Sequence, residues 1–170
     1  LSVAQNETLG IIGPNGAGKT SFFNLLSGIR PATRGRIFLG EKEITHMSID
    51  ERARSGIART FQTSSIFTNL TLLENVRIGA QASLGGSFNI TKNAYKFTDS
   101  LEMAHACLQQ VGLKSRTLQI AGSLSHGDKR RLEIAIVLAS SAEVILLDEP
   151  MAGMSVENVP ELVEIIRSLA

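Results

Sequence analysis

Eight consecutive residues have the types and spacing that hold phosphate groups in nucleotide-binding proteins. They are, in order, Gly13, Pro14, Asn15, Gly16, Ala17, Gly18, Lys19 and Thr20. The glycines let backbone N–H groups converge on phosphate oxygens with no side chain between them. The Lys19 ammonium would reach the β- and γ-phosphates, and the Thr20 hydroxyl would be a ligand of Mg²⁺. An ordinary glycine-rich turn is the alternative, but the pattern favours a site for a nucleoside triphosphate.

The predicted phosphate-binding set ends at Thr20. A second threonine at position 21 would extend it, but the sequence has Ser21 there. No cofactor-binding role is therefore predicted at position 21.

Two carboxylates follow a short apolar run near the end of the chain. The run covers residues 144–147, and Asp148 and Glu149 come directly after it. A buried strand would deliver both side chains at its C-terminal end, where ligand sites of α/β proteins lie. Asp148 suits the Mg²⁺ shell, directly or through water, and Glu149 suits a general base or a group that orients the attacking water. A strand that ends in a solvated acidic turn is the alternative, and the phosphate loop upstream disfavours it.

The elements around these residues alternate between strands and helices, which predicts an α/β domain with a mainly parallel sheet. Residues 9–12 are predicted to form a buried strand before the loop, residues 19–27 a helix after it, and residues 143–148 a second buried strand. The other predicted elements are a hairpin over 36–44 with Gly40 in its turn, a strand over 57–61, helices over 48–55 and 101–111, helices beginning at Thr71 and Ser125, a loop or linker over 84–98, and a last helix capped by Ser155.

The middle of the chain is almost free of predicted strands. Residues 63–125 are therefore expected to be a helical subdomain inserted between two sheet-forming parts, 1–62 and 126–170. Together the three parts would form one domain, which agrees with the length of 170 residues.

The composition excludes several classes of protein. Seventeen basic side chains against sixteen acidic ones leave a net charge of +1, so the sequence predicts no nucleic-acid partner. The apolar runs are much shorter than the ~20 residues of a membrane-spanning helix. Cys107 is the single cysteine, which precludes an internal disulfide and fits a reducing compartment.

A motif between the phosphate loop and the two carboxylates narrows the choice. Residues 124–128, Leu-Ser-His-Gly-Asp, resemble the signature motif of ABC ATPases, usually Leu-Ser-Gly-Gly-Gln. Gln62, after a predicted strand, is similar to the glutamine of that family's Q-loop. The resemblance covers essentially the whole chain. It implies a P-loop NTPase (RecA-like) core sheet with an inserted α-helical subdomain.

Four stretches, residues 56–62, 69–75, 127–135 and 152–155, resemble a narrower subfamily. They are similar to the ATPase subunits of importers for branched-chain amino acids, or of the closely similar urea importers. The resemblance implies an ATP-binding and ATP-hydrolysing subunit, cytoplasmic and peripheral on the inner face of the cell membrane. Its implied partners are a second ATPase subunit, transmembrane permease subunits and, indirectly, a solute-binding protein.

The resemblance also implies roles for single residues. Two subunits would pair head to tail, so that Ser125 and the Gly127 backbone contact the γ-phosphate held by the other subunit. The implied catalytic residues are Glu149, Gln62 and Lys19, and the implied magnesium ligands are Thr20, Gln62 and Asp148. Gln62 would contact the Mg²⁺ or the attacking water.

Three residues depart from the family's motifs. His126 and Asp128 replace the usual Gly and Gln of the signature, and Ser155 stands where the D-loop usually has Asp. We expect His126 and Asp128 to preserve the motif, and Ser155 to cap a helix near the dimer interface.

Two features of the family are not found in the sequence. No aromatic residue precedes Gly13, where members stack a ring on adenine, and the chain ends at Ala170 before a switch histidine could follow. The sequence is therefore expected to be an internal part of a longer subunit, with its sheet truncated at both ends. A nucleotide-binding module without turnover stays open as an alternative. Two others are disfavoured: a soluble ABC protein acting on ribosomes or DNA, and a kinase that uses the same phosphate loop.

Overall fold

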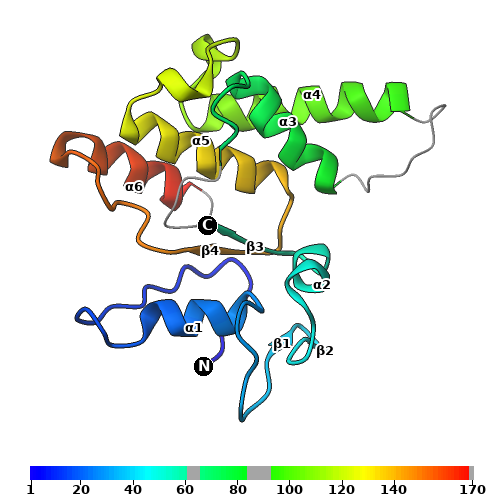
Figure 1. The fold of residues 1–170 in the computed structure, drawn as a ribbon, viewed down its shortest axis with the longest axis vertical. Coiled ribbons are helices and arrows are strands. Elements are labelled where there is room, and N and C mark those ends of the chain that lie inside the picture. Colours follow the sequence, from blue (N-terminus) through cyan, green and yellow to red (C-terminus); the bar gives the residue numbers. More distant parts are fainter. Residues whose placement is uncertain (61–65, 84–92, 169–170) are drawn as a thin grey trace.

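The structure is a computed structural model that describes residues 1–60, 66–83 and 93–168 (Figure 1). Its helices and strands, in chain order, are α1 Lys19–Leu26, β1 Phe38–Leu39, β2 Lys42–Glu43, α2 Ile49–Arg54, β3 Ile57–Thr60, α3 Leu72–Ser83, α4 Asn93–Gln110, α5 His126–Ala139, β4 Val144–Leu147 and α6 Val159–Arg167. Short 3₁₀ turns cover Lys114–Arg116, Ala121–Ser123 and Val156–Asn158. No helix in this described part is both long and apolar enough to cross a membrane.

Strands β3 and β4 pair in parallel, with Ile57 opposite Val144 and Thr60 opposite Leu147. A parallel pair needs a long crossover, and here the crossover contains α3, α4 and α5. Figure 1 shows the pair between two layers, with α3 to α6 on one side and α1 on the other. The second sheet is the predicted hairpin of β1 and β2, which turns at Gly40 with a positive φ of 56°.

The hydrophobic core lies in the layer of α3, α4, α5 and α6. Its fully buried side chains include Leu72, Val76, Leu108, Leu132 and Leu162. Helices α3 and α5 approach closely at Gly79, where an added Cβ would lie 2.8 Å from the backbone oxygen of Ile136. Only glycine permits this approach without a shift of the backbone.

Helix α1 is held in a different way, because none of its residues is fully buried. The guanidinium of Arg52, with 1% of the residue exposed, donates to the backbone oxygens of Leu25 at 2.5 Å and Leu26 at 2.9 Å. It also donates to the Thr45 oxygen at 2.8 Å. A cation at the C-terminal carbonyls of a helix satisfies groups that have no partner within the helix. Hydrogen bonds from α2 therefore fix the end of α1.

Most of the predicted elements are confirmed where local signals specify them. Helix α2 starts with a capping box, in which Ser48 and Glu51 each bond the other's backbone N–H. Helices α1, α3 and α5, the hairpin and strand β3 also follow the predictions. Phe61, the last residue predicted for that strand, lies outside the described residues.

The strand predicted over residues 9–12 is wrong. The segment has no regular secondary structure, and Ile12 is 95% exposed. An apolar run becomes a strand only where a neighbour pairs with its backbone. In the described structure β4 pairs with β3 alone, and residues 9–12 pair with neither.

Two further predictions need correction. Helix α4 begins at Asn93, so residues 93–98 are helical and not a loop, because packing against α3 stabilises a helix that local composition does not reveal. Helix α6 begins at Val159, after a 3₁₀ turn at whose N-cap Ser155 makes no side-chain capping hydrogen bond. Strand β4 is also less buried than expected, with only Leu146 fully covered among its four residues.

Candidate functional site

The phosphate loop forms a tight turn that opens directly into α1. Gly16 and Gly18 have φ of 83° and 91°, a conformation that favours glycine. A Cβ added at either glycine would meet nothing within 4 Å, so the space beside the loop is open. Gly18 is the N-cap of α1, and the N–H groups of the first helical turn therefore point toward the loop. A helix N-terminus in this position attracts anions.

The Lys19 side chain folds back over the loop. Its Nζ donates to the backbone oxygen of Gly13 at 2.6 Å and of Pro14 at 3.0 Å. Thr20 lies next to it in the first turn of α1 and is half-buried. The positive charge thus lies against the loop's own carbonyls, and phosphate oxygens would replace these acceptors when a nucleotide binds.

Position 21 follows Thr20 in the first turn of α1. The residue at position 21 is Ser21, for which no role is predicted. Ser21 is exposed, whereas Thr20 is half-buried beside the loop. The hydroxyl predicted as a magnesium ligand is that of Thr20.

Asp148 is buried at the end of β4 and is paired with an arginine. Its Oδ2 accepts from the Nη2 of Arg59 at 2.8 Å, and both side chains are buried. The Nη1 of Arg59 also donates to the side chains of Asn24 at 2.7 Å and Ser27 at 3.0 Å, both on α1 or at its end. One guanidinium on β3 therefore joins the strand that carries Asp148 to the helix that follows the phosphate loop.

Glu149 lies exposed in the turn after β4, with a positive φ of 47°. The buried Arg130 of α5 donates to three consecutive backbone oxygens of this turn, those of Asp148, Glu149 and Pro150. A non-glycine residue in this conformation is uncommon and is held by its surroundings. Here the surroundings include Arg130.

The signature residues begin helix α5. Ser125 is the N-cap, where its Oγ accepts from the Asp128 N–H at 3.2 Å and donates to Asp128 Oδ2 at 2.9 Å. Gly127 is buried in the first turn, whereas Ser125 is exposed. The exposed His126 packs against Gly153, since a Cβ added there would lie 2.5 Å from the His126 Nε2. The signature therefore contacts the segment that follows Glu149.

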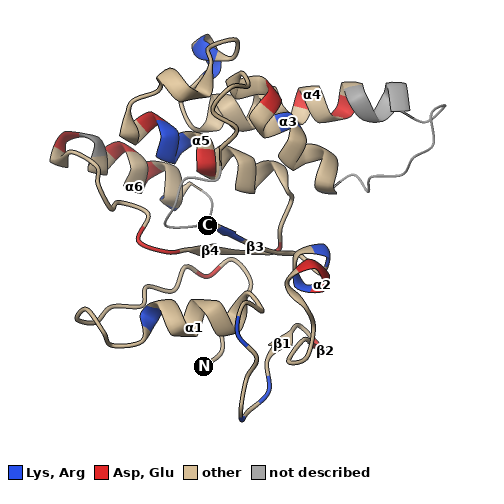
Figure 2. Ribbon diagram, viewed as in Figure 1, with Lys and Arg blue, Asp and Glu red and all other residues tan. Residues whose placement is uncertain are grey.

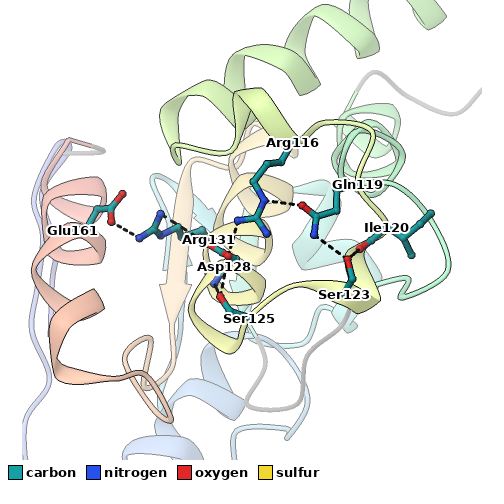
Figure 3. A network of polar contacts seen from close by, with 8 residues as sticks. All are labelled: Arg116, Gln119, Ile120, Ser123, Ser125, Asp128, Arg131 and Glu161. Atoms are coloured by element: carbon teal, nitrogen blue, oxygen red, sulfur yellow. Dashed lines mark hydrogen bonds and ion pairs between the residues drawn. The ribbon is translucent and has the colours of Figure 1, made fainter.

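Two arginines surround Asp128 (Figure 3). Arg116 Nη1 donates to Asp128 Oδ2 at 2.7 Å. Arg131 Nη1 lies 3.9 Å from Asp128 Oδ1, and Arg131 also forms an ion pair with Glu161. Burial opposes the charged carboxylate, but the hydrogen bonds from Arg116 and Ser125 and the two positive charges outweigh it and lower the pKa of Asp128. Asp128 is thus held as an anion beside the signature serine.

The structure describes all but one of the predicted site residues. Arg59 links Asp148 to α1, which begins directly after the phosphate loop. Ser125 and Gly127 lie at the start of α5. Gln62 lies outside the described residues. Thr20 and Asp148 supply the oxygen ligands that Mg²⁺ prefers, and the open loop with its lysine fits nucleotide phosphates, so the residues present fit both groups.

Sequence reasoning missed the arginines that organise the site: Arg59, Arg116 and Arg130. One signal could have found the first, because Arg59 lies within a predicted strand and a buried charge requires a partner. The other two lie close to the signature motif but give no local pattern of their own.

Several known proteins are similar in sequence to this chain. A family model described as ABC transporter matches residues 1–152. The chain is 36% identical over 174 residues to the high-affinity branched-chain amino acid transport ATP-binding protein LivG of Salmonella typhimurium, covering 99% of this chain and 68% of LivG. It is also 36% identical over 169 residues to the lipopolysaccharide export system ATP-binding protein LptB of Acidithiobacillus ferridurans, covering 99% and 66%.

A solved structure agrees with these sequence matches. It is an ATP-binding cassette of an ABC transporter in its ADP conformation, with a TM-score of 0.77 and 30% identity. The match covers 93% of this chain and 63% of that chain, so the sequence described here spans about two thirds of the length of its relatives.

The buried pair of Arg59 and Asp148 predicts a large loss of stability when one partner is removed. Arg59→Met would leave the Asp148 carboxylate buried without its cation, which costs about 3–5 kcal/mol. Arg167→Met is the matched control, because Arg167 and Glu164 form a pair that is about 70% exposed on both sides and such pairs are worth about 1 kcal/mol or less. Urea unfolding of the full-length protein measures both losses. Equal midpoint shifts in the two variants would contradict the prediction.

The lowered pKa of Asp128 predicts a pH-dependent contribution to stability. Because the folded pKa lies below the ordinary value of 3.8, this contribution is fully present above pH 3.8 and is lost as the pH falls through the folded pKa. The unfolding free energies of wild type and Asp128→Asn should differ by a constant amount near neutral pH and converge below pH 3.8. A difference that stays constant down to pH 3 would refute this assignment.

Proposed function

The chain belongs to the ABC transporter family of ATP-binding proteins, and on that premise we propose that it binds and hydrolyses ATP to power an importer of branched-chain amino acids. The observation that carries the proposal is the 36% sequence identity to LivG, in a match that covers 99% of this chain. An importer of urea or another small solute is the alternative within the same reading. The equal identity to LptB favours lipopolysaccharide export as a second candidate.

The proposed reaction is in-line attack of water on the γ-phosphate, which breaks the bond from the γ-phosphorus to the β–γ bridging oxygen and releases ADP and inorganic phosphate. Residues 13–20 bind the phosphates through backbone N–H groups, and Lys19 stabilises the negative charge that develops on the γ-phosphate. Glu149 orients the attacking water and accepts its proton. Thr20, Gln62 and Asp148 would hold Mg²⁺, which would supply positive charge near the phosphates.

We propose that the signature acts on a second subunit. Ser125 is exposed at the N-terminus of α5, and the N–H groups of that first turn can receive an anion from outside the chain. In a head-to-tail dimer this anion would be the γ-phosphate bound by the partner. The proposed dimer binds permease subunits in the membrane, and through them it acts indirectly with a solute-binding protein. The ATPase subunit would lie on the cytoplasmic face of the membrane.

The charge distribution supports partners other than nucleic acid. Figure 2 shows acidic and basic positions intermixed along α2 and α5, and the net charge of the whole sequence is only +1. Binding to a phosphate backbone needs clustered basic side chains. We propose that residues 1–62 and 126–170 form the core and that residues 63–125 form a helical subdomain.

The role of Glu149 gives a direct test of ATP hydrolysis. Glu149→Gln in the full-length protein should bind ATP as wild type does and lose turnover by about 100-fold or more, because a general base contributes on that scale. Glu157→Gln, an exposed glutamate in the next turn, is the matched control and should retain full turnover. Steady-state ATPase rates and equilibrium nucleotide binding are measured side by side. Unchanged turnover in Glu149→Gln would refute the proposed hydrolysis.

The transported solute needs a separate experiment. The full-length protein, assembled in vesicles with the permease subunits of a branched-chain amino acid importer, should drive ATP-dependent uptake of labelled leucine, isoleucine and valine. The same vesicles with Glu149→Gln should take up none. Uptake of urea alone would favour the alternative importer, and extraction of lipopolysaccharide without any uptake would favour export.

A further inference from the structure

A single buried arginine holds the turn that carries Glu149. Arg130 lies on α5 and is 7% exposed. Its Nε donates to the Pro150 oxygen at 2.9 Å, and its Nη2 donates to the oxygens of Asp148 at 2.9 Å and Glu149 at 3.0 Å. A planar guanidinium presents several N–H donors in fixed directions, whereas an ammonium is a compact charge on a flexible stem. The path of the backbone through Glu149 is therefore tied to α5.

The turn needs such support because its backbone is strained. Glu149 has a φ of 47°, where a side chain with a Cβ is disfavoured. Its carbonyl oxygen also accepts from the Ala152 N–H at 3.0 Å. These contacts hold the backbone of Glu149 in one conformation and so fix the direction in which its side chain leaves the chain. Without Arg130 the residue can relax to an ordinary backbone conformation that points the side chain elsewhere.

The arginine is itself fixed in place. Its Nη1 donates to Glu133 Oε2 at 2.6 Å, and Glu133 is also buried. The pair stands one turn apart on α5, so the carboxylate both neutralises the buried charge and orients the guanidinium toward the turn. Arg130 is thus a rigid connection between helix and turn.

Helix α5 also connects Arg130 to the signature residues. The helix starts after the signature Ser125, about one and a half turns before Arg130. We propose that Arg130 is a positioning residue for Glu149, which fixes the direction of its carboxylate and couples it to the signature end of α5. The inference rests on the proposed role of Glu149 in hydrolysis. A shift of the signature when it meets its ligand would then reach the turn through one side chain.

The first test separates positioning from nucleotide binding. In the full-length protein Arg130→Met should lower kcat by on the order of 10- to 100-fold, the scale of losses from misplaced catalytic groups. The KM and Kd for ATP should change much less than kcat, because the hydrogen bond of Arg130 to Asp148 goes to the backbone oxygen and not to the carboxylate proposed as a magnesium ligand. Arg130→Lys should recover part of kcat, because an ammonium can still reach some of the three carbonyls. Wild-type kcat in Arg130→Met would overturn the inference.

A second comparison distinguishes positioning from general destabilisation. Leu108→Ala, in α4 and fully buried, lowers the melting temperature without touching the turn. It should keep kcat per folded molecule, whereas Arg130→Met should not. Equal losses of kcat in the two variants overturn the inference. If Arg130→Met does not fold, Arg130→Lys becomes the test, and an unchanged kcat in that variant overturns it.

The last measurement asks whether Arg130 acts through Glu149. Because Glu149→Gln already removes the group being positioned, the double variant with Arg130→Met should be no slower than Glu149→Gln alone. A further loss equal to that of Arg130→Met in the wild-type background would show an independent role and overturn the inference. If Glu149→Gln itself keeps full turnover, the proposed function fails, whatever Arg130 does.

Discussion

The buried ion pair of Arg59 and Asp148 is the constraint on which the site depends. It joins β3 to β4, and through Asn24 and Ser27 it joins both strands to α1. Burying two charges costs about as much free energy as their attraction returns, so the pair adds little net stability over an apolar contact. Arrangements that separate the partners are strongly disfavoured, however, because each would leave a charge buried alone. The pair therefore specifies where Asp148 lies relative to the helix of the phosphate loop.

The same solution recurs at two other places where apolar packing is thin. Helix α1 has no fully buried residue, and Arg52 fixes its C-terminal carbonyls from α2. The turn after β4 is strained, and Arg130 fixes its carbonyls from α5. The hydrophobic core lies in the helical layer, so the loop and the turn that would touch a nucleotide are positioned by directional hydrogen bonds. Such contacts can be exchanged when a ligand arrives, whereas close-packed side chains respond to small changes with strain.

Much of the local structure could be predicted because its signals lie within a few residues. Ser48 and Glu51 specify the start of α2, Ser125 the start of α5, and the spacing of the glycines the phosphate loop. The prediction failed for residues 9–12, where an apolar run does not say which strand will pair with it. It also could not supply the arginine contacts, since Arg59 and Asp148 are 89 positions apart and Arg130 lies 18 positions from Asp148. Those contacts depend on the fold as a whole, and no local pattern encodes them.

The two departures in the signature motif have different physical counterparts, an electrostatic one for Asp128 and a packing one for His126. A glutamine is neutral, whereas Asp128 brings a negative charge within hydrogen-bond distance of Ser125, where an anion would have to bind. Arg116 and Arg131 compensate that charge (Figure 3), so neighbouring side chains neutralise the negative charge that aspartate brings to this position. Asp128 also accepts a hydrogen bond from the Ser125 hydroxyl, and a phosphate oxygen must compete for that donor. His126 fills space against Gly153, which glycine at position 126 would leave empty. The departures thus tie the signature more firmly to its own chain, to the 3₁₀ turn at Arg116 on one side and to the segment after Glu149 on the other.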